Sequence, residues 1–299
     1  MIRKLMLMLL ALAMTTACAA ADTITDMHGR TIDLAEPVTR VVALTAADCE
    51  ILCALGAQDA LVGRGEYCNY PADILDRPVV QSGANTNVEE ILALQPQVLL
   101  MNDMAQNPEQ IEQLERSGVR VVVSDATDIE GVYTAIRMIG QLTGRDAQAE
   151  ALIADMQAAF ADIAARCGQT GKTVYFEVSP LQYGLWTAGS GTFMDELAGI
   201  CGLTNAFADV QGWAQISEEQ VLARDPDIIV TNAMAWGDGP TPVEEIMSRE
   251  GWQGLKAVQS GSVLSADPDM ISRPGPRLVD AAWQLYQFIT GEAEEVPAA

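Results

Sequence analysis

NVEEILALQPQVLLMN, residues 87–102, returns later in the chain as SEEQVLARDPDIIVTN, residues 217–232. The two stretches align without a gap, with Glu89 matching Glu219 and a proline at the same place in each. The apolar run VLL of the first copy becomes IIV in the second. A sequence that repeats itself in this way predicts two structural units of the same kind.

Each copy is typical of a short helix followed by a buried strand. Asn87 and Ser217 are good N-cap residues, and Glu90 and Gln220, three residues later, complete the pattern of a capping box. The proline in each copy then ends the helix. The continuous apolar run that follows predicts a strand buried on both faces, as in a parallel sheet.

The rest of the chain alternates strands and helices in the same manner. Alternation of this kind predicts parallel sheets with helical crossovers, so we expect an α/β protein with two lobes. The further strands are expected at 40–44, 120–125, 173–178 and 262–267, and the further helices at 48–56, 109–118, 193–202 and 243–251.

The segment between the lobes, residues 129–168, is expected to form a long connecting helix. Apolar residues fall on one helical face over 132–143 and again over 152–163. No Gly-, Pro- or Ser-rich linker is present, as free hinge motion would require. We therefore expect an N-terminal lobe, residues 22–128, held stiffly apart from a C-terminal lobe, residues 169–299. The repeat argues against the alternative of crossovers within one large sheet.

Residues 1–21 have the layout of a secretory signal peptide. Two basic residues precede a short apolar run, which is too short for a transmembrane helix, and small residues follow it. Two cleavage sites compete: a lipoprotein-like box, TTAC, which would leave Cys18 lipidated, and ordinary cleavage after Ala21. We expect the first, although Thr15 stands where such boxes usually carry leucine. The protein is then extracytoplasmic, either anchored to the membrane or periplasmic.

Composition argues against several function classes. With 17 Lys and Arg against 41 Asp and Glu, the formal net charge is −24, which disfavours nucleic acid and anionic lipid as partners. Five cysteines follow Cys18, an odd number, and we expect Cys49 and Cys53 to pack as small apolar residues rather than to form a bridge. His28 is the only histidine, so we predict no metal site belonging to the protein itself.

The sequence carries none of the common catalytic motifs. GxSxG, Walker and GxGxxG patterns are absent, so we expect a protein that is not an enzyme. Ligands of open α/β sheets bind beyond the carboxyl ends of the strands. The residues that follow the strands are therefore the candidates for a cleft between the lobes, namely 45–48, 64–70, 102–104, 179–186, 233–236 and 267–273.

Several motifs, taken in order, resemble those of one family. They are RVVAL (40–44), GEYCNYP (65–71), TNVEEILALQPQVLL (86–100), GWAQISEEQVLARDPDIIV (212–230) and RPGPRLVDA (273–281). Together they resemble the substrate-binding proteins of ABC importers for metal chelates: cobalamin, ferric siderophores and haem. The resemblance implies two Rossmann-like lobes with parallel sheets, joined by a long rigid helix, and a bound chelate of cobalt or iron as the only metal-containing group.

The resemblance also implies how the protein meets its transporter. In this family a glutamate on each lobe docks onto arginines of the permease dimer, and the matching residues are Glu89 and Glu219. A carrier with the same charge on both lobes suits a two-fold symmetric partner. The alternative is that both are first-turn acids favoured by the helix dipole, but their paired positions favour docking.

Aromatic residues are expected to line the cleft. GEYCNYP resembles the tyrosine loop of cobalamin binders, which places Tyr67 against the ligand, whereas Tyr70 is expected to pack the loop. Trp213 matches a pocket tryptophan of the same binders, with a core position as an equal alternative. The other expected ligand-binding residues are Arg64, Trp186, Trp236 and Arg273. The alternative for the two arginines is a surface ion pair.

The resemblance leaves the chelate open. We expect cobalamin first and ferric siderophores next. Haem is the alternative within the same importer class, although His28 lies outside the cleft candidates and leaves Tyr67 or a methionine as the axial ligand. A chelatase-like enzyme is the alternative of another class. The protein itself is expected to be a monomer whose partners are the permease dimer and a small-molecule chelate, with no nucleic acid.

Overall fold

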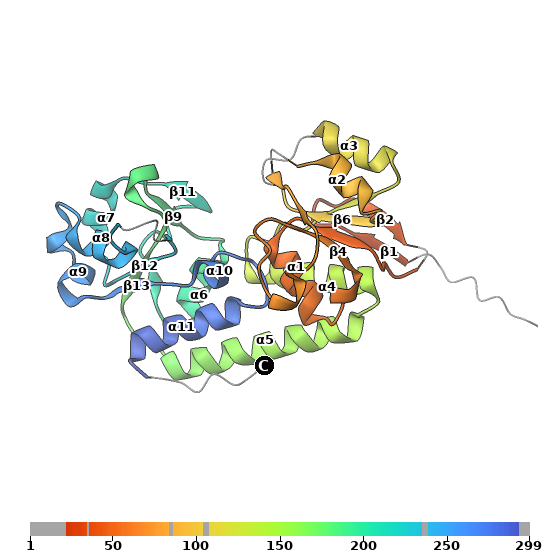
Figure 1. The fold of residues 1–299 in the computed structure, drawn as a ribbon. Coiled ribbons are helices and arrows are strands. Elements are labelled where there is room, and N and C mark those ends of the chain that lie inside the picture. The colour runs from red at the N-terminus through yellow and green to blue at the C-terminus, as the bar shows by residue number, and fades with distance from the viewer. Residues whose placement is uncertain (1–21, 35, 84–85, 104–107, 235–238, 293–299) are drawn as a thin grey trace, which may run out of the picture.

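Two sheets organise the computed structural model, which describes residues 22–34, 36–83, 86–103, 108–234 and 239–292 (Figure 1). The first-lobe sheet has the order β5-β4-β3-β6-β7, with every pair parallel. A hairpin, β1 (Asp22–Thr25) and β2 (Thr31–Leu34), adjoins it. The remaining elements of this lobe are β3 (Val41–Ala43), α1 (Ala46–Ala54), β4 (Leu61–Gly65), β5 (Val79–Val80), α2 (Val88–Ala93), β6 (Val98–Met101), α3 (Pro108–Arg116) and β7 (Arg120–Val123).

The second-lobe sheet has the order β11-β9-β8-β12-β13, with β10 paired to the start of β8. Its β9 runs antiparallel to β8, because only a short turn over residues 180–185 joins them and a parallel strand would need a longer crossover. The elements are β8 (Thr173–Ser179), β9 (Trp186–Ala188), α6 (Phe193–Ile200), β10 (Thr204–Asn205), β11 (Trp213–Gln215), α7 (Glu218–Arg224), β12 (Ile228–Thr231), α8 (Pro242–Ser248), α9 (Lys256–Ser260), β13 (Val263–Ser265), α10 (Pro268–Ile271) and α11 (Leu278–Thr290).

The sequence repeat corresponds to α2–β6 in the first lobe and α7–β12 in the second. Both strands have a parallel neighbour on each side, and all four residues of each are buried, which confirms the prediction of strands buried on both faces. The capping box was predicted in both copies and closes only in the second, between Ser217 and Gln220. In the first copy, Asn87 accepts hydrogen bonds from the amides of Glu89 and Glu90.

Residues 129–168 form two helices, which differs from the single connecting helix expected. The first, α4 (Ile129–Thr143), packs against α1 and β1 of the first lobe and ends at Gly144, whose φ of 67° is left-handed. The second, α5 (Asp146–Cys167), contacts α4 and also α6 and α11. It is about 33 Å long and runs beneath both lobes (Figure 1). Of these two helices, α5 is therefore the one that carries the chain from lobe to lobe.

One hydrophobic core continues from lobe to lobe through α5. It includes Val41 and Ile51 of the first lobe, Met156 of α5, and Leu197 and Trp283 of the second lobe. The lobes are therefore packed on a common base. In the part of the chain that the structure describes, no helix has both the length and the hydropathy needed to cross a bilayer. The expected signal peptide, with Cys18, lies outside the described residues.

Candidate functional site

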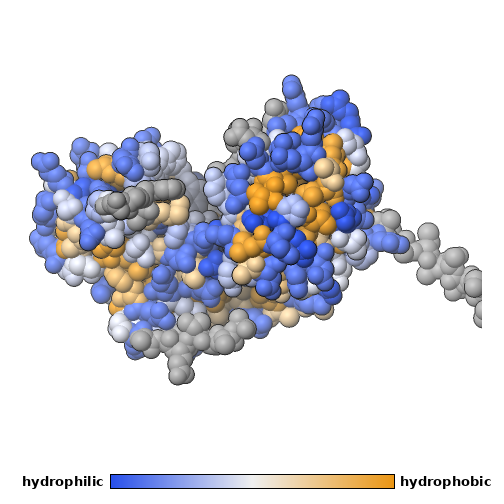
Figure 2. Space-filling model, in the orientation of Figure 1, coloured by the Kyte–Doolittle hydropathy of each residue, from blue (hydrophilic) through white to orange (hydrophobic). Residues whose placement is uncertain are grey.

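The carboxyl ends of the first-lobe strands lie at the junction with the second lobe. A small cavity of about 40 Å³ is lined there by Thr45 after β3, Asn102 after β6, Ser124 after β7, and Pro274 of the second lobe. The surface is hollowed between the lobes, on the side away from α5 (Figure 2). The structure thus places a cleft where the strand-end rule predicts it.

The loop 65–71 follows β4 at this edge. Gly65 is required at its start, because a Cβ there would lie 2.2 Å from the carbonyl oxygen of Leu44. Tyr67 is 72% exposed, whereas Cys68 next to it is fully buried. Alternation along the loop therefore directs the Tyr67 side chain outward and the thiol into the lobe.

Arg64 supports this loop from inside, which differs from the ligand-binding position expected. It is buried and donates from Nε to the carbonyl of Ile74, from Nη1 to that of Cys68 and from Nη2 to that of Leu75, at 2.8–3.2 Å. Because the guanidinium bonds to backbone carbonyls, Arg64 offers no free positive charge to a ligand.

Arg273 also lies at the cleft edge, but its guanidinium is occupied by protein groups. It donates to Glu50 Oε1 at 2.9 Å, to Asn69 Oδ1 at 2.8 Å and to the carbonyl of Tyr67 at 3.2 Å, and it pairs with Asp269. Arg273 therefore lies next to the tyrosine loop, as predicted, but its charge is paired with protein acids.

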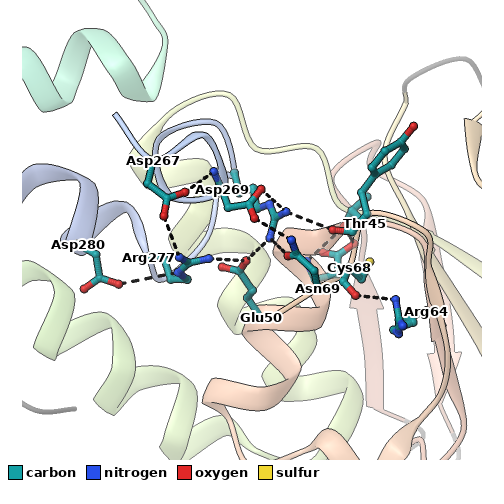
Figure 3. Close-up of polar contacts among 12 residues, drawn as sticks. Thr45, Glu50, Arg64, Cys68, Asn69, Asp267, Asp269, Arg277 and Asp280 are labelled. Carbon is teal, nitrogen blue, oxygen red and sulfur yellow. Dashed lines mark hydrogen bonds and ion pairs between the residues drawn. The ribbon is translucent and has the colours of Figure 1, made fainter. Parts of the chain in front are cut away.

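A second arginine of the RPGPR segment joins the same network (Figure 3). Arg277 lies 3.5 Å from Glu50 Oε1 and within 4.0 Å of Asp267 and Asp280, and its guanidinium stacks 4.2 Å from the ring centroid of Tyr70. Tyr70 thus packs the loop against the second lobe, in the way expected.

Glu50 and Arg277 were missed as site residues. Glu50 is almost fully buried, and burial raises its pKa while the two arginines counteract that shift. Its signal in the sequence was an acid inside the apolar helix DCEILCALG, which needs a buried cation as its partner. Arg277 was inside a quoted motif but had no assigned role.

Two of the predicted tryptophans lie on one face of the second-lobe sheet. Trp186 pairs with Gln215 and Trp213 pairs with Ala188, so alternation places both rings on the same side as diagonal neighbours. Each is more than a third exposed, and Trp213 also packs against Phe193 at 5.4 Å between ring centroids. Trp213 is therefore a half-exposed platform and not a core residue. Trp236 lies outside the described residues.

A larger cavity of about 450 Å³ lies at the carboxyl ends of β8 and β12. Its walls include Leu181, Met234 and Pro240, and its acids are Glu177 and Glu245. Both acids are paired with Arg249, whose contact to Glu177 is buried on both sides at 2.8 Å. The lining is thus largely apolar, and both of its acids are bonded to the same protein arginine.

His28 lies closer to the strand ends than expected. Its Nε2 is 3.6 Å from Asp103, which lies two residues after β6 and belongs to a cleft candidate segment. Asp125 follows β7, and one ligand atom from each of the three residues lies within 4.8 Å of the others, a spacing that can accommodate a metal ion. Burial, followed by the charge of Asp103, raises the pKa of Asp125.

Glu89 and Glu219 occupy equivalent exposed positions on their lobes. Each is in the first turn of its helix, α2 or α7, on the side of the lobe away from α5 (Figure 1). A hydrogen bond from Ser217 lowers the pKa of Glu219, so this side chain is charged at neutral pH. The two helices therefore carry an exposed acid at matching positions.

Comparison with known proteins identifies the family. The model of the family described as "Periplasmic binding protein" matches residues 41–270. The substrate-binding lipoprotein YvrC of an ABC transporter from Bacillus subtilis is 32% identical over 89% of this chain and 85% of that protein. A cobalamin-binding protein from Halobacterium salinarum is 30% identical over 88% of this chain and 73% of that protein.

A solved structure agrees with the sequence comparisons. A periplasmic haem-binding protein from Pseudomonas aeruginosa is 25% identical with a TM-score of 0.76, and the match covers 87% of this chain and 95% of that one. The chain therefore belongs to the periplasmic binding protein family, and the predicted resemblance and two-lobed α/β fold are confirmed. Members of this family bind solutes for transport.

Proposed function

We propose that this protein captures cobalamin in the cleft between its lobes and delivers it to an ABC permease. One observation carries the choice of ligand: the cleft edge offers exposed aromatic rings, and its arginines are neutralised from within. Arg64 serves backbone carbonyls, while Arg273 and Arg277 share Glu50 and neighbouring aspartates. Such a cleft disfavours ligands whose carboxylates require a free cation.

The chemistry of the ligands separates them on this ground. Cobalamin surrounds its corrin ring with neutral amides, which need hydrogen bonds and stacking rather than a positive charge. Haem carries two propionates, and many ferric siderophores are anionic. Tyr67 on one lobe and Trp186 and Trp213 on the other supply flat apolar surfaces from two sides. The cobalamin-binding relative supports the same choice.

The test is a titration of the purified apo-protein followed by absorbance and calorimetry. Cyanocobalamin is expected to bind with Kd of roughly 1 µM or tighter, and haemin and an anionic ferric catecholate at least about 100-fold more weakly. If haemin or the catecholate binds more tightly than cyanocobalamin, the choice of ligand is wrong. Failure of all three to bind removes the proposal.

Haem is the second candidate because of His28. The imidazole is near Asp103 at the carboxyl edge of β6, so it joins Tyr67 as a candidate axial ligand. The haem-binding neighbour shares the fold. If haem is the ligand, His28→Ala or Tyr67→Phe shifts the Soret band of the complex, whereas a ring that is only stacked in the cleft leaves the band unchanged.

Docking on the permease is proposed to use Glu89 and Glu219. Charge reversal of both, Glu89→Lys with Glu219→Lys, is expected to abolish uptake while the affinity for the chelate stays unchanged, because both side chains are exposed and neither is assigned to the ligand. The charge-matched control is Glu109→Lys with Glu250→Lys, which reverses one exposed acid on each lobe outside α2 and α7. Uptake that persists in the double variant contradicts the assignment of these two glutamates to docking.

A further inference from the structure

The tyrosine loop of the first lobe is tied directly to the second lobe. Asn69 Nδ2 donates to Asp269 Oδ2 at 2.8 Å, and Arg273 reaches Asn69 Oδ1 and the carbonyl of Tyr67 at 2.8 and 3.2 Å. These partners are about two hundred residues apart in the sequence. We call Glu50, Asn69, Arg273 and Arg277 the interlobe latch (Figure 3).

The charges of the latch make it costly to open. Glu50 is 2% exposed at its side chain and receives both guanidiniums on one oxygen, Oε1. Its other oxygen, Oε2, has no hydrogen-bond partner within the described chain. Separating the lobes here would break both ion pairs of this carboxylate at once, and buried ion pairs cost more to break than exposed ones. The contact is therefore expected to remain closed whether or not a ligand is bound.

The latch acts on the residue that we propose to face the ligand. Arg273 holds the Tyr67 backbone from the second lobe, and Arg64 holds the carbonyl of Cys68 from below. The Tyr67 ring itself remains exposed and makes none of these bonds. Its position in the cleft is thus set by groups on both lobes, and the same bonds set the distance between the lobes at that point.

We propose that the interlobe latch consists of positioning residues that fix Tyr67 and the width of the cleft before the chelate arrives. The inference rests on the proposed function, because it assigns the latch to the site at which the chelate binds. A preformed aromatic wall binds more tightly than one that is ordered on binding, since the ordering entropy is already paid in folding.

The experiment measures loop mobility and ligand affinity in the same variants. Arg273→Gln removes the charge at similar size, Arg273→Lys retains the charge but not the fork of donors, and Asn69→Ala removes only an exposed amide from the loop. Arg224→Gln is the control, because its ion pair with Asp209 lies within the second lobe. Hydrogen exchange of the peptide covering residues 65–71 is followed in the apo-protein, and Kd is measured with cyanocobalamin.

Arg273→Gln is expected to speed exchange of the loop about tenfold or more and to weaken cyanocobalamin binding by at least a similar factor. Arg273→Lys is expected to restore part of the loop protection and part of the affinity. Asn69→Ala is expected to speed exchange and weaken binding as Arg273→Gln does, but by less. The control should change neither. If Arg273→Gln fails to fold, as circular dichroism would show, Asn69→Ala decides the question.

Two results overturn the inference. Unchanged loop exchange in Arg273→Gln shows that the latch does not hold the loop. Faster exchange with unchanged affinity shows that it holds the loop without positioning anything for the ligand. If wild-type protein binds no cyanocobalamin, the proposed ligand is wrong, and exchange alone then decides whether the latch fixes the position of Tyr67.

Discussion

Each lobe has a helix that begins with the same threonine cap, but the aspartate three residues later lies in a different environment in each lobe. Thr45 caps α1 and accepts from the amide of Asp48, and Thr192 caps α6 and accepts from the amide of Asp195. In the second lobe the Asp195 carboxylate receives a hydrogen bond from Asn205 at 3.0 Å. In the first lobe Asp48 is fully buried, and its Oδ1 has no partner among the described residues.

The difference follows from where each helix lies. α1 comes directly after β3, and its first turn packs at the junction of the lobes, with Ala47 only 3.7 Å from where a Cβ on Gly275 would lie. In the second lobe the antiparallel strand β9 intervenes between β8 and the helix. The same local sequence pattern therefore gives a hydrogen-bonded aspartate in the second lobe and a fully buried aspartate in the first.

Buried arginines show a parallel contrast. In the second lobe, Arg249 pairs with the buried carboxylate of Glu177 and stacks on Trp252 at 4.1 Å. In the first lobe, Arg64 pairs with three neutral carbonyls. Replacing an arginine that pairs with a buried carboxylate should cost more stability than replacing one that bonds to neutral carbonyls. The two lobes should therefore respond differently to the loss of their buried arginine.

The largest effect is expected from Arg249→Met. Burial raises the pKa of Glu177, and the bonds to Arg249 are the main opposing influence, with a smaller one from Tyr175, so the variant leaves a buried acid without its cation. We expect a loss of about 3–5 kcal/mol in the free energy of unfolding, measured by urea denaturation. The double variant Glu177→Gln with Arg249→Met should recover much of this loss. Equal stability of the two variants would contradict a buried pair.

The next effect is a pH dependence located in the first lobe. Burial raises the pKa of Asp48 to about 7, while hydrogen bonds from Thr45 and Ser124 oppose the shift. The folded state then binds a proton that the unfolded state has already lost, so stability falls as pH rises from about 4 to about 7 and is flat above. The loss is at most about 4 kcal/mol, since each pKa unit corresponds to about 1.4 kcal/mol.

Asp48→Asn is expected to remove this fall, because the amide does not ionise. The variant should be more stable than wild type at pH 8 and lose that advantage towards pH 4, as followed by urea unfolding across the pH range. Curves that run parallel for the two proteins would show that Asp48 does not carry the dependence.

A smaller effect is expected from Arg64→Met. The variant leaves the carbonyls of Cys68, Ile74 and Leu75 without their donor, at a cost of about 2–3 kcal/mol in the free energy of unfolding. Because these carbonyls support the loop 65–71, cyanocobalamin binding should weaken as well. Arg249→Met should affect stability more and the loop less. The reverse ranking would overturn the contrast between the lobes.

Much of the architecture was predictable because it rests on local patterns. The repeat predicted α2–β6 and α7–β12 at their observed positions, since a capped helix, a proline and an apolar run leave little freedom. β9 and β11 were not predicted, because WTA and WAQ are too short to show alternation. The single connecting helix was divided by Gly144, whose left-handed conformation ends α4.

The candidate site was less predictable, since its character depends on contacts between distant residues. Strand-end reasoning named the segments of Tyr67, Trp186 and Arg273 as cleft candidates, and the family resemblance added Trp213. Neither could show that Arg273 is neutralised by Glu50, 223 residues away. Arg273 thus took the ion-pair alternative, whereas Arg64 bonds to backbone carbonyls only 4–11 residues along the chain. Net charge and motif spacing show which charged side chains the chain contains. Which partner each one binds depends on the folded structure.

The smallest effects should come from the aromatic rings of the cleft, one on each lobe. Tyr67→Leu and Trp213→Leu remove exposed or half-exposed rings, so unfolding free energies should change little, while each costs about 1–2 kcal/mol of cyanocobalamin binding. Leu222→Ala, which removes an exposed apolar side chain from α7 outside the cleft candidate segments, is the control. If both lobes grip the same ligand rigidly, the double variant Tyr67→Leu with Trp213→Leu loses the sum of the two costs. A double variant no weaker than Tyr67→Leu alone would mean that the first lobe binds the chelate without the second, since a ring that touches the ligand must cost affinity when it is removed.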